Sequence, residues 1–185
     1  MAPKENIEAV RLRIDNERTG STKSNLHWFV PQTALEHIFT ASTIARCVAE
    51  VVCEVEDRIG LAAAIESHGT TIFAILIWMR QEDAIVAFRR SSCLDRLPLD
   101  LTTALRVAPD FGRDLVEEHQ WHFLPHSFRE DEDIEIDPLV ILPFMREIGQ
   151  TEGGGFGTIN RLELHPTQHD FNKASPLLQA RRGAY

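Results

Sequence analysis

The pattern of apolar and polar positions along the chain predicts a mainly α-helical protein. In residues 5–18, Ile7, Val10 and Ile14 lie three and four positions apart, which is the spacing of one face of an amphipathic helix. The run Thr70–Met79 is apolar nearly all round, and this predicts a helix at the centre of a helical core. Further helices are expected from about Ser42 to Gly60, over Leu61–Ile65, over Gln81–Arg90 and from Pro109 to about Gln120.

Local signals predict where these helices begin and end. Ser42 or Thr43 is the expected N-cap of the helix that carries the stripe from Ile44 to Val55. Ser67 to Gly69 should interrupt the helical pattern before Thr70. Residues 91–101 contain a proline and are expected to form a loop laid over the core by three leucines, Leu94, Leu97 and Leu99.

Beyond Phe144 the pattern changes from helix to strand. Leu162 and Leu164 alternate with charged residues, as in a half-buried strand, and three consecutive glycines precede them. We therefore expect a β-hairpin whose first strand is Met145–Gly149 and whose second strand is Thr158–His165, ended by Pro166. The segment Thr167–Tyr185 has no periodic apolar pattern and is expected to be poorly ordered.

The glycine-rich segment of this hairpin has a composition suited to binding phosphate groups. Glycine has no Cβ, so its backbone N–H groups can approach a bulky anion closely. The GxGFGxI ending resembles the glycine-rich loop of protein kinases, GxGxxGxV, in which an aromatic residue caps the loop and a branched residue packs on the nucleotide base. The matching residues are Gly153, Gly154, Gly155, Phe156, Gly157 and Ile159, with Phe156 and Ile159 in the last two roles.

This loop differs from the kinase pattern in its length. Counting back from Gly157 places Gly154 at the second glycine and Glu152 where the first is expected. Gly149 resembles a displaced first glycine, so the loop is two or three residues longer than in the family. A flexible hairpin connection without a ligand is the alternative interpretation, because short motifs also match by chance.

The flanks of the loop resemble a group of fungal serine/threonine kinase-like proteins. The segments IDPLVILPFMREIG and RLELHPTQHDF carry the resemblance, which covers residues 25–171 and is specific from about Gln120 onward. In those proteins an N-terminal helical region leads into a kinase domain. From the apolar pattern and composition we expect an N-terminal helix and linker at 1–24, a helical domain at 25–146 and a disordered tail at 172–185. The resemblance implies that 147–171 is a hairpin like the first two kinase strands.

Kinase catalysis requires a strand lysine, metal-binding carboxylates and a catalytic aspartate. None of these parts can be placed in the chain, and Lys173 lacks the expected surroundings. We therefore expect the N-terminal portion of a kinase-like protein that cannot transfer phosphate alone, with no catalytic residues and no metal ligands. ATP is implied by resemblance only, and tight binding is not expected. The alternative is a helical interaction or regulatory module without nucleotide binding, whose partner is another protein or the missing kinase lobe.

Composition narrows the possible partners and compartments. With 28 acidic and 19 basic side chains the formal net charge is −9, which argues against nucleic acid and anionic membranes as partners. Three cysteines without a CxxC pair are typical of a reducing compartment. The N-terminus shows no signal-peptide pattern, and Thr70–Met79 is too short to span a bilayer. The expected location is intracellular, in the cytoplasm or the nucleus.

Three other groups of side chains have both a structural and a functional interpretation. Arg89 and Arg90 are typical of a solvated helix end, and the alternative is a site for phosphate or an acidic partner. The acidic segment 129–135 is typical of a solvated loop, with a cation site as the alternative. His165 and His169 have the spacing of a helical zinc site, but Pro166 between them disfavours a helix.

Overall fold

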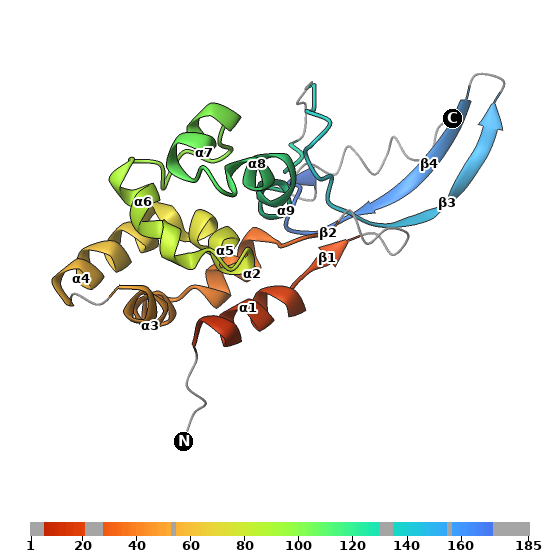
Figure 1. Cartoon of the computed structure of the whole chain (residues 1–185). Helices are drawn as coiled ribbons and strands as arrows, with labels where there is room; N and C mark the ends of the chain where they lie inside the picture. Colours follow the sequence, from red (N-terminus) through yellow and green to blue (C-terminus); the bar gives the residue numbers. More distant parts are fainter. Residues whose placement is uncertain (1–5, 21–27, 53–54, 130–134, 155–156, 172–185) are drawn as a thin grey trace.

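A computed structural model of the chain describes residues 6–20, 28–52, 55–129, 135–154 and 157–171. For Glu56, 146–154 and 157–162 the description extends to the backbone alone. The protein is a mainly helical body from which one long β-hairpin projects (Figure 1). This arrangement confirms the predicted fold class. The predicted tail at 172–185 lies outside the described residues.

The N-terminal helix forms as its apolar pattern predicts. Helix α1 spans Ile7–Asn16, and the side chain of Asn6 caps it by accepting a hydrogen bond from the amide of Ala9. Ile7, Val10 and Ile14 are buried and belong to the main hydrophobic core, where α1 packs against α2 (Gln32–Ile38) and α5 (Thr70–Trp78). The burial of this face explains why a ten-residue helix is stable here.

Helices α3 and α4 divide what the sequence predicts as one helix. Helix α3 spans Ala41–Val51 and its N-cap is Thr40, whose hydroxyl accepts from the amide of Thr43, so the predicted caps at Ser42 and Thr43 are wrong. Val52 is extended, and α4 begins at Val55 and continues through Gly60 to Ala64. Val55, predicted to be buried, is 64% exposed.

The predicted interruption at Ser67–Gly69 is also wrong. Residues Ile65–Gly69 form a π-helical turn, η1, which joins α4 to α5 without a break. The hydroxyl of Thr70 donates to the carbonyl of Ile65 at 3.1 Å, which satisfies a carbonyl inside the widened turn. Gly69 lies against Leu94, whose Cδ2 would be 3.3 Å from a Cβ at this position, so a small residue suits the packing.

Helix α5 forms the centre of the core, as predicted. Every residue from Ile72 to Ile77 is buried, and α1, α2, α6 and α9 contact this helix. Within the described part of the chain, Asp57–Trp78 is a 22-residue helical run with a hydropathy of 1.4, long and apolar enough by length and composition to cross a membrane. A core helix of a soluble protein meets the same criterion, and 44% of the apolar stretch tested within Asp57–Trp78 is buried inside the fold.

The second half of the helical body contains one helix that the sequence analysis missed. A 3-10 turn η2 (Glu82–Ala84) leads into α6 (Ile85–Arg90), and the loop after α6 packs Leu94 and Leu99 into the core as predicted. Helix α7 (Leu101–Val107) then follows, although no helix was predicted here. Asp100 caps it by accepting from the side chain and amide of Thr103, and the side-chain hydrogen bond is the main cause that lowers the pKa of Asp100.

The last helical segment begins later and ends later than predicted. It consists of α8 (Gly112–Asp114), a π turn η3 (Leu115–His119) and α9 (Gln120–Phe123), which follow one another without a gap. Gln120 is fully buried and holds the preceding loop, since its Oε1 accepts from the amide of Leu99 at 2.9 Å and its Nε2 donates to the carbonyl of Leu99 at 3.3 Å.

Two pairs of antiparallel strands complete the fold. The short strands β1 (Thr19–Gly20) and β2 (Trp28–Phe29) pair beside the helical body. The hairpin is formed by β3 (Phe144–Gly154) and β4 (Gly157–Leu164), and it extends away from the helices (Figure 1). Both strands are present as predicted, but β3 continues five residues past its predicted end at Gly149.

The residues just after the hairpin are ordered, contrary to the expectation for the whole segment from Thr167. Gln168 is buried, and its carbonyl accepts from the amide of Phe128 at 3.0 Å. The amide of Asp170 donates to the carbonyl of Phe128 at 3.3 Å. These hydrogen bonds join residues 168–170 to Phe128, which lies between α9 and the hairpin. Disorder was predicted from the apolar pattern of 167–185 alone, and that pattern contains no information on backbone contacts with Phe128.

Candidate functional site

The glycine-rich segment occupies the tip and upper part of the β3–β4 hairpin. Gly154 pairs with Gly157, Thr151 pairs with Ile159, and Gly149 pairs with Arg161. Gly153 lies within β3, whereas Gly155 and Phe156 lie outside the described residues. The structure therefore places the described residues of the predicted loop in the two antiparallel strands on either side of residues 155 and 156.

The pairing of β3 with β4 is irregular in three places. Between Thr151 and Gly154 strand β3 advances by three residues while β4 advances by two, from Ile159 to Gly157. Similar one-residue shifts occur between Phe144 and Arg146 and between Glu147 and Gly149. Each shift has the form of a β-bulge, which inserts one residue and bends the strand. One of the three shifts, between Thr151 and Gly154, falls inside the glycine-rich segment and adds one residue to β3.

The base of the hairpin is connected to the helical body by aromatic side chains. Phe128 stacks on Phe144 with ring centroids 6.4 Å apart, and His126 contacts Phe128 edge-on at 4.6 Å. The amide of His165, at the end of β4, donates to the carbonyl of Pro143 at 2.9 Å. His165 also contacts Phe29 edge-on at 5.6 Å, so the hairpin base packs on β2 as well.

A second aromatic cluster lies inside the helical body and includes a buried histidine. The ring of His122 stacks on Trp28 at 3.8 Å, and its Nδ1 lies 2.7 Å from the carbonyl oxygen of Trp28. The guanidinium of Arg18 lies over the same indole ring at 4.2 Å. Burial lowers the pKa of His122, because the charged form loses its hydration. This cluster joins the end of α9 to β2 and is structural.

The chain contains an Asp-Phe-Gly triplet, Asp110–Gly112, which the sequence analysis overlooked when it found no metal-binding motif. In the kinase signature such a triplet follows the glycine-rich loop and supplies a magnesium ligand. Here it precedes the loop and leads from the turn after α7 into Gly112, the first residue of α8. A Cβ on Gly112 would lie 2.6 Å from the backbone carbonyl of Ala104, so the glycine is explained by close helix packing.

The two histidines with zinc spacing do not lie on a helix. His165 follows β4, and its Nδ1 lies 2.9 Å from the hydroxyl of Thr167. Burial is the main cause that lowers the pKa of His165, and the nearby charge of His169 adds to it. In the described ranges no group of three or more His, Cys, Asp or Glu side chains is placed to hold a metal ion. Most of the acidic segment 129–135 lies outside those ranges.

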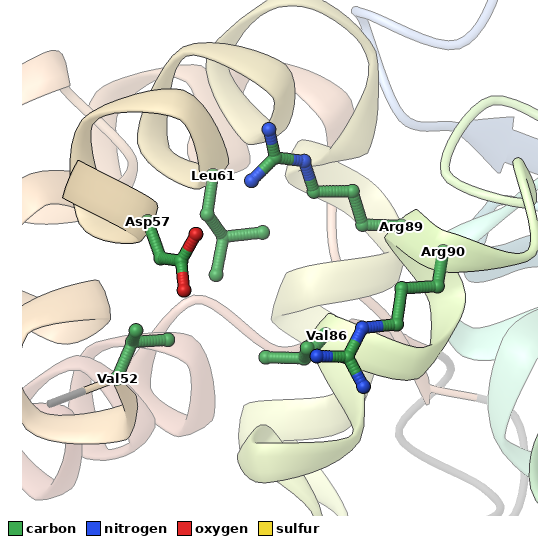
Figure 2. Close-up of a pocket in the computed structure, with 6 residues that line it drawn as sticks. All are labelled: Val52, Asp57, Leu61, Val86, Arg89 and Arg90. Atoms are coloured by element: carbon green, nitrogen blue, oxygen red, sulfur yellow. The ribbon is translucent and has the colours of Figure 1, made fainter. Parts of the chain in front are cut away.

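Arg89 and Arg90 line a cavity between three helical segments. The cavity has a volume of about 320 Å³ and lies between the end of α3, the first turns of α4 and helix α6 (Figure 2). Figure 2 shows Asp57 on the α4 side, Arg90 on the α6 side, and the guanidinium of Arg89 reaching from α6 towards α4. Its lining residues are Val52, Asp57, Leu61, Val86, Arg89 and Arg90. Sequence reasoning singled out the arginines but had no signal for the other four, which come from separate segments.

The comparisons with known proteins identify no relative of the chain. No protein-family model, curated protein or solved structure matches the chain. The kinase-like and fungal resemblance therefore stays a prediction from the residues that carry it.

Proposed function

We propose that the chain is the N-terminal portion of a protein-kinase-like protein, in which a helical domain leads into the glycine-loop hairpin of an ATP-binding lobe. The observation that carries the proposal is the pairing of Gly154 with Gly157 at the tip of an antiparallel hairpin. A glycine loop between two antiparallel strands is the arrangement in which kinases cover the phosphates of ATP. The resemblance of the flanking segments adds to this support.

The proposal includes the absence of phosphate transfer by these 185 residues alone. A nucleotide site must bury most of its ligand between opposing walls, and a projecting hairpin supplies one wall. Lys173, the one lysine after the loop, lies outside the described residues and lacks the sequence surroundings of a strand lysine. The loop is therefore a phosphate-binding element without the groups that stabilise a transferred phosphoryl group.

The natural messenger RNA tests the first part of the proposal. Its reading frame is expected to run past the codon for Tyr185 in at least one transcript and to encode, shortly afterwards, a strand that carries a lysine. If every transcript of the locus lacks such a strand, the kinase-like assignment is wrong. For the second part, the purified chain should transfer no label from ATP to protein, and a transfer that disappears in Gly154→Asp would contradict it.

A second function, a helical interaction module, is favoured by two exposed apolar side chains on α4. Val55 and Ile59 lie one turn apart on the same face of the helix and are 64% and 72% exposed. An apolar pair of this kind on a surface helix is suited to a protein partner. Under this interpretation the helical body binds the kinase catalytic lobe, and the hairpin need not bind nucleotide.

This second function is tested by calorimetric titration of the full chain with a separately purified kinase catalytic fragment. The double variant Val55→Ser, Ile59→Ser should lose most of the binding. Leu12→Ser removes a side chain that is 60% exposed on α1, far from this pair in sequence, and serves as the control that keeps the binding. Equal affinity of the double variant and the natural chain would exclude α4 as the interface.

A further inference from the structure

The cavity beside α6 lies outside the glycine-loop hairpin and has a lining of both apolar and charged side chains. Three apolar side chains, Val52, Leu61 and Val86, share its lining with Asp57 and the two arginines. Its volume of about 320 Å³ is at the lower end of the range of small-molecule sites, so it suits a group the size of a substituted phosphate rather than a whole nucleotide.

The Arg89 guanidinium lies close to Gly60, where a larger residue would leave it no room. A Cβ on Gly60 would lie 2.8 Å from Nη2 of Arg89 and 3.5 Å from Nη1. The guanidinium thus rests against the backbone of α4 in the space that Gly60 leaves open. This contact places the guanidinium of the exposed Arg89 side chain beside α4, at the wall of the cavity.

The charges around the cavity leave the two arginines available for a ligand. Across the ranges that the structure describes, neither Arg89 nor Arg90 forms an ion pair within 4 Å. Among the described lining residues Asp57 is the acidic one, and it projects from α4, across the cavity from Arg90 (Figure 2). Two neighbouring positive charges that form no ion pair with a described residue stand out in a chain whose formal net charge is −9.

We propose that this cavity binds an oxyanion attached to a small apolar group. Guanidinium groups hold the oxygens of phosphate and carboxylate groups by paired, charge-assisted hydrogen bonds. Val52, Leu61 and Val86 contact the apolar part of the ligand, and Asp57 lowers the affinity by repelling the anion. The site is separate from the glycine loop, since none of its lining residues belongs to β3 or β4.

Titrations of the full chain at low salt, followed by amide NMR signals of α4 and α6, test this site with three probes. Phenyl phosphate should bind in a saturable manner and more tightly than inorganic phosphate, because of the apolar lining. Benzoate distinguishes a carboxylate from a phosphate ester as the preferred group, and tighter binding of either compound supports the site. The absence of saturable binding by phenyl phosphate and benzoate overturns it.

Four variants locate the binding to the named residues. Arg89→Gln and Arg90→Gln should each weaken it by roughly three- to fivefold, as expected for partly exposed charge pairs. Arg106→Gln makes the same charge change on α7, outside the cavity, and should leave the affinity unchanged. Asp57→Asn should tighten the binding. Equal weakening by Arg106→Gln and the two cavity variants, or no effect of either cavity variant, overturns the proposal.

Gly60→Ala separates the geometry of Arg89 from its charge. The methyl group would occupy the place of the guanidinium and turn it away, so the affinity should fall by about as much as in Arg89→Gln while the net charge is kept. Circular dichroism checks that the helices are retained. Unchanged affinity in a folded Gly60→Ala variant would show that the contact with α4 does not position Arg89. None of these measurements depends on ATP, so their failure would not bear on the hairpin.

Discussion

Substitution of Gly112 by alanine should destabilise the protein, because the backbone of α7 occupies the space that the new methyl group needs. The added Cβ would lie 2.6 Å from the carbonyl carbon and oxygen of Ala104 and 2.9 Å from the amide nitrogen of Leu105. Favourable contacts between carbon atoms begin near 3.5 Å, so the overlap is about 1 Å. Backbone atoms cannot rotate out of the way, and α7 and α8 would have to separate.

The expected loss is about 2 kcal/mol of the free energy of unfolding. Overpacking of this kind costs roughly 1–3 kcal/mol, and the upper part of the range applies when backbone atoms clash. Replacing glycine by alanine in a helix returns up to about 1 kcal/mol. A net loss of about 2 kcal/mol lowers the midpoint of urea unfolding by about 1 M, at a slope of roughly 2 kcal/mol per molar. The melting temperature should fall by about 4–8 °C.

Gly60→Ala is the matched control in the same assay, followed by the helical circular dichroism signal. Its new methyl group meets only the end of the flexible Arg89 side chain, so the helix should keep or gain stability, by at most about 1 kcal/mol. If Gly112→Ala unfolds at the same urea concentration as the natural chain, the close packing of α7 on α8 is wrong. The interpretation of the Asp110–Gly112 triplet as a packing turn would then lose its support.

Three further perturbations test the helical body by urea unfolding. Gln120→Leu leaves the amide and carbonyl of Leu99 without their side-chain partners and should cost about 2–4 kcal/mol, whereas equal stability would show that water replaces the glutamine. Ile14→Ala should cost about 2–5 kcal/mol, against less than about 0.5 kcal/mol for the exposed Leu12→Ala, and similar losses would contradict the placement of α1. The pKa of His122 in the fold is lowered from 6.5, so as the pH falls the unfolded chain takes up the histidine proton before the folded chain does. The free energy of unfolding should therefore be level above about pH 6.5 and decrease below it. The decrease should be smaller in His122→Gln.

The sequence predicted the elements whose signal is strong and local. The unbroken apolar run from Thr70 correctly predicted the central helix. Six consecutive apolar residues cover every face of a helix, so such a helix must be surrounded by other elements. The spacing of Ile7, Val10 and Ile14 likewise predicted α1. The alternation around Leu162 and the adjacent glycines predicted the hairpin, and the glycine-rich residues whose backbone is described lie in its strands.

The errors arise where tertiary packing overrides a local signal. Gly60 and Gly69 were interpreted as helix ends, but α4 passes through Gly60 and a π turn carries the helix past Gly69. The sequence contains a capping signal for α7, namely Asp100 with Thr103 three residues later. It was missed because the preceding proline led us to interpret the segment as a loop. The length of β3 depends on bulges, and a bulge adds a residue without a recognisable pattern.

The candidate sites could be predicted only in part, for the same reason. The glycine motif is contiguous in sequence, so its residues were found together. The cavity around Arg89 and Arg90 combines residues from α4, α6 and the position just after α3, and nothing in the sequence connects Val52 or Asp57 with the arginines. Intracellular location and ATP as a ligand stay predictions, since no described contact bears on them.

The central claim is that the glycine hairpin is the phosphate-binding element of a kinase-like lobe. It is tested most directly by the ATP affinity of two proteins: the 185-residue chain, and the product of the longest transcript that contains it. We predict no saturable ATP binding by the 185-residue chain, and binding by the longer product that Gly154→Asp removes. ATP binding that is equal in both proteins and unaffected by Gly154→Asp would contradict the account.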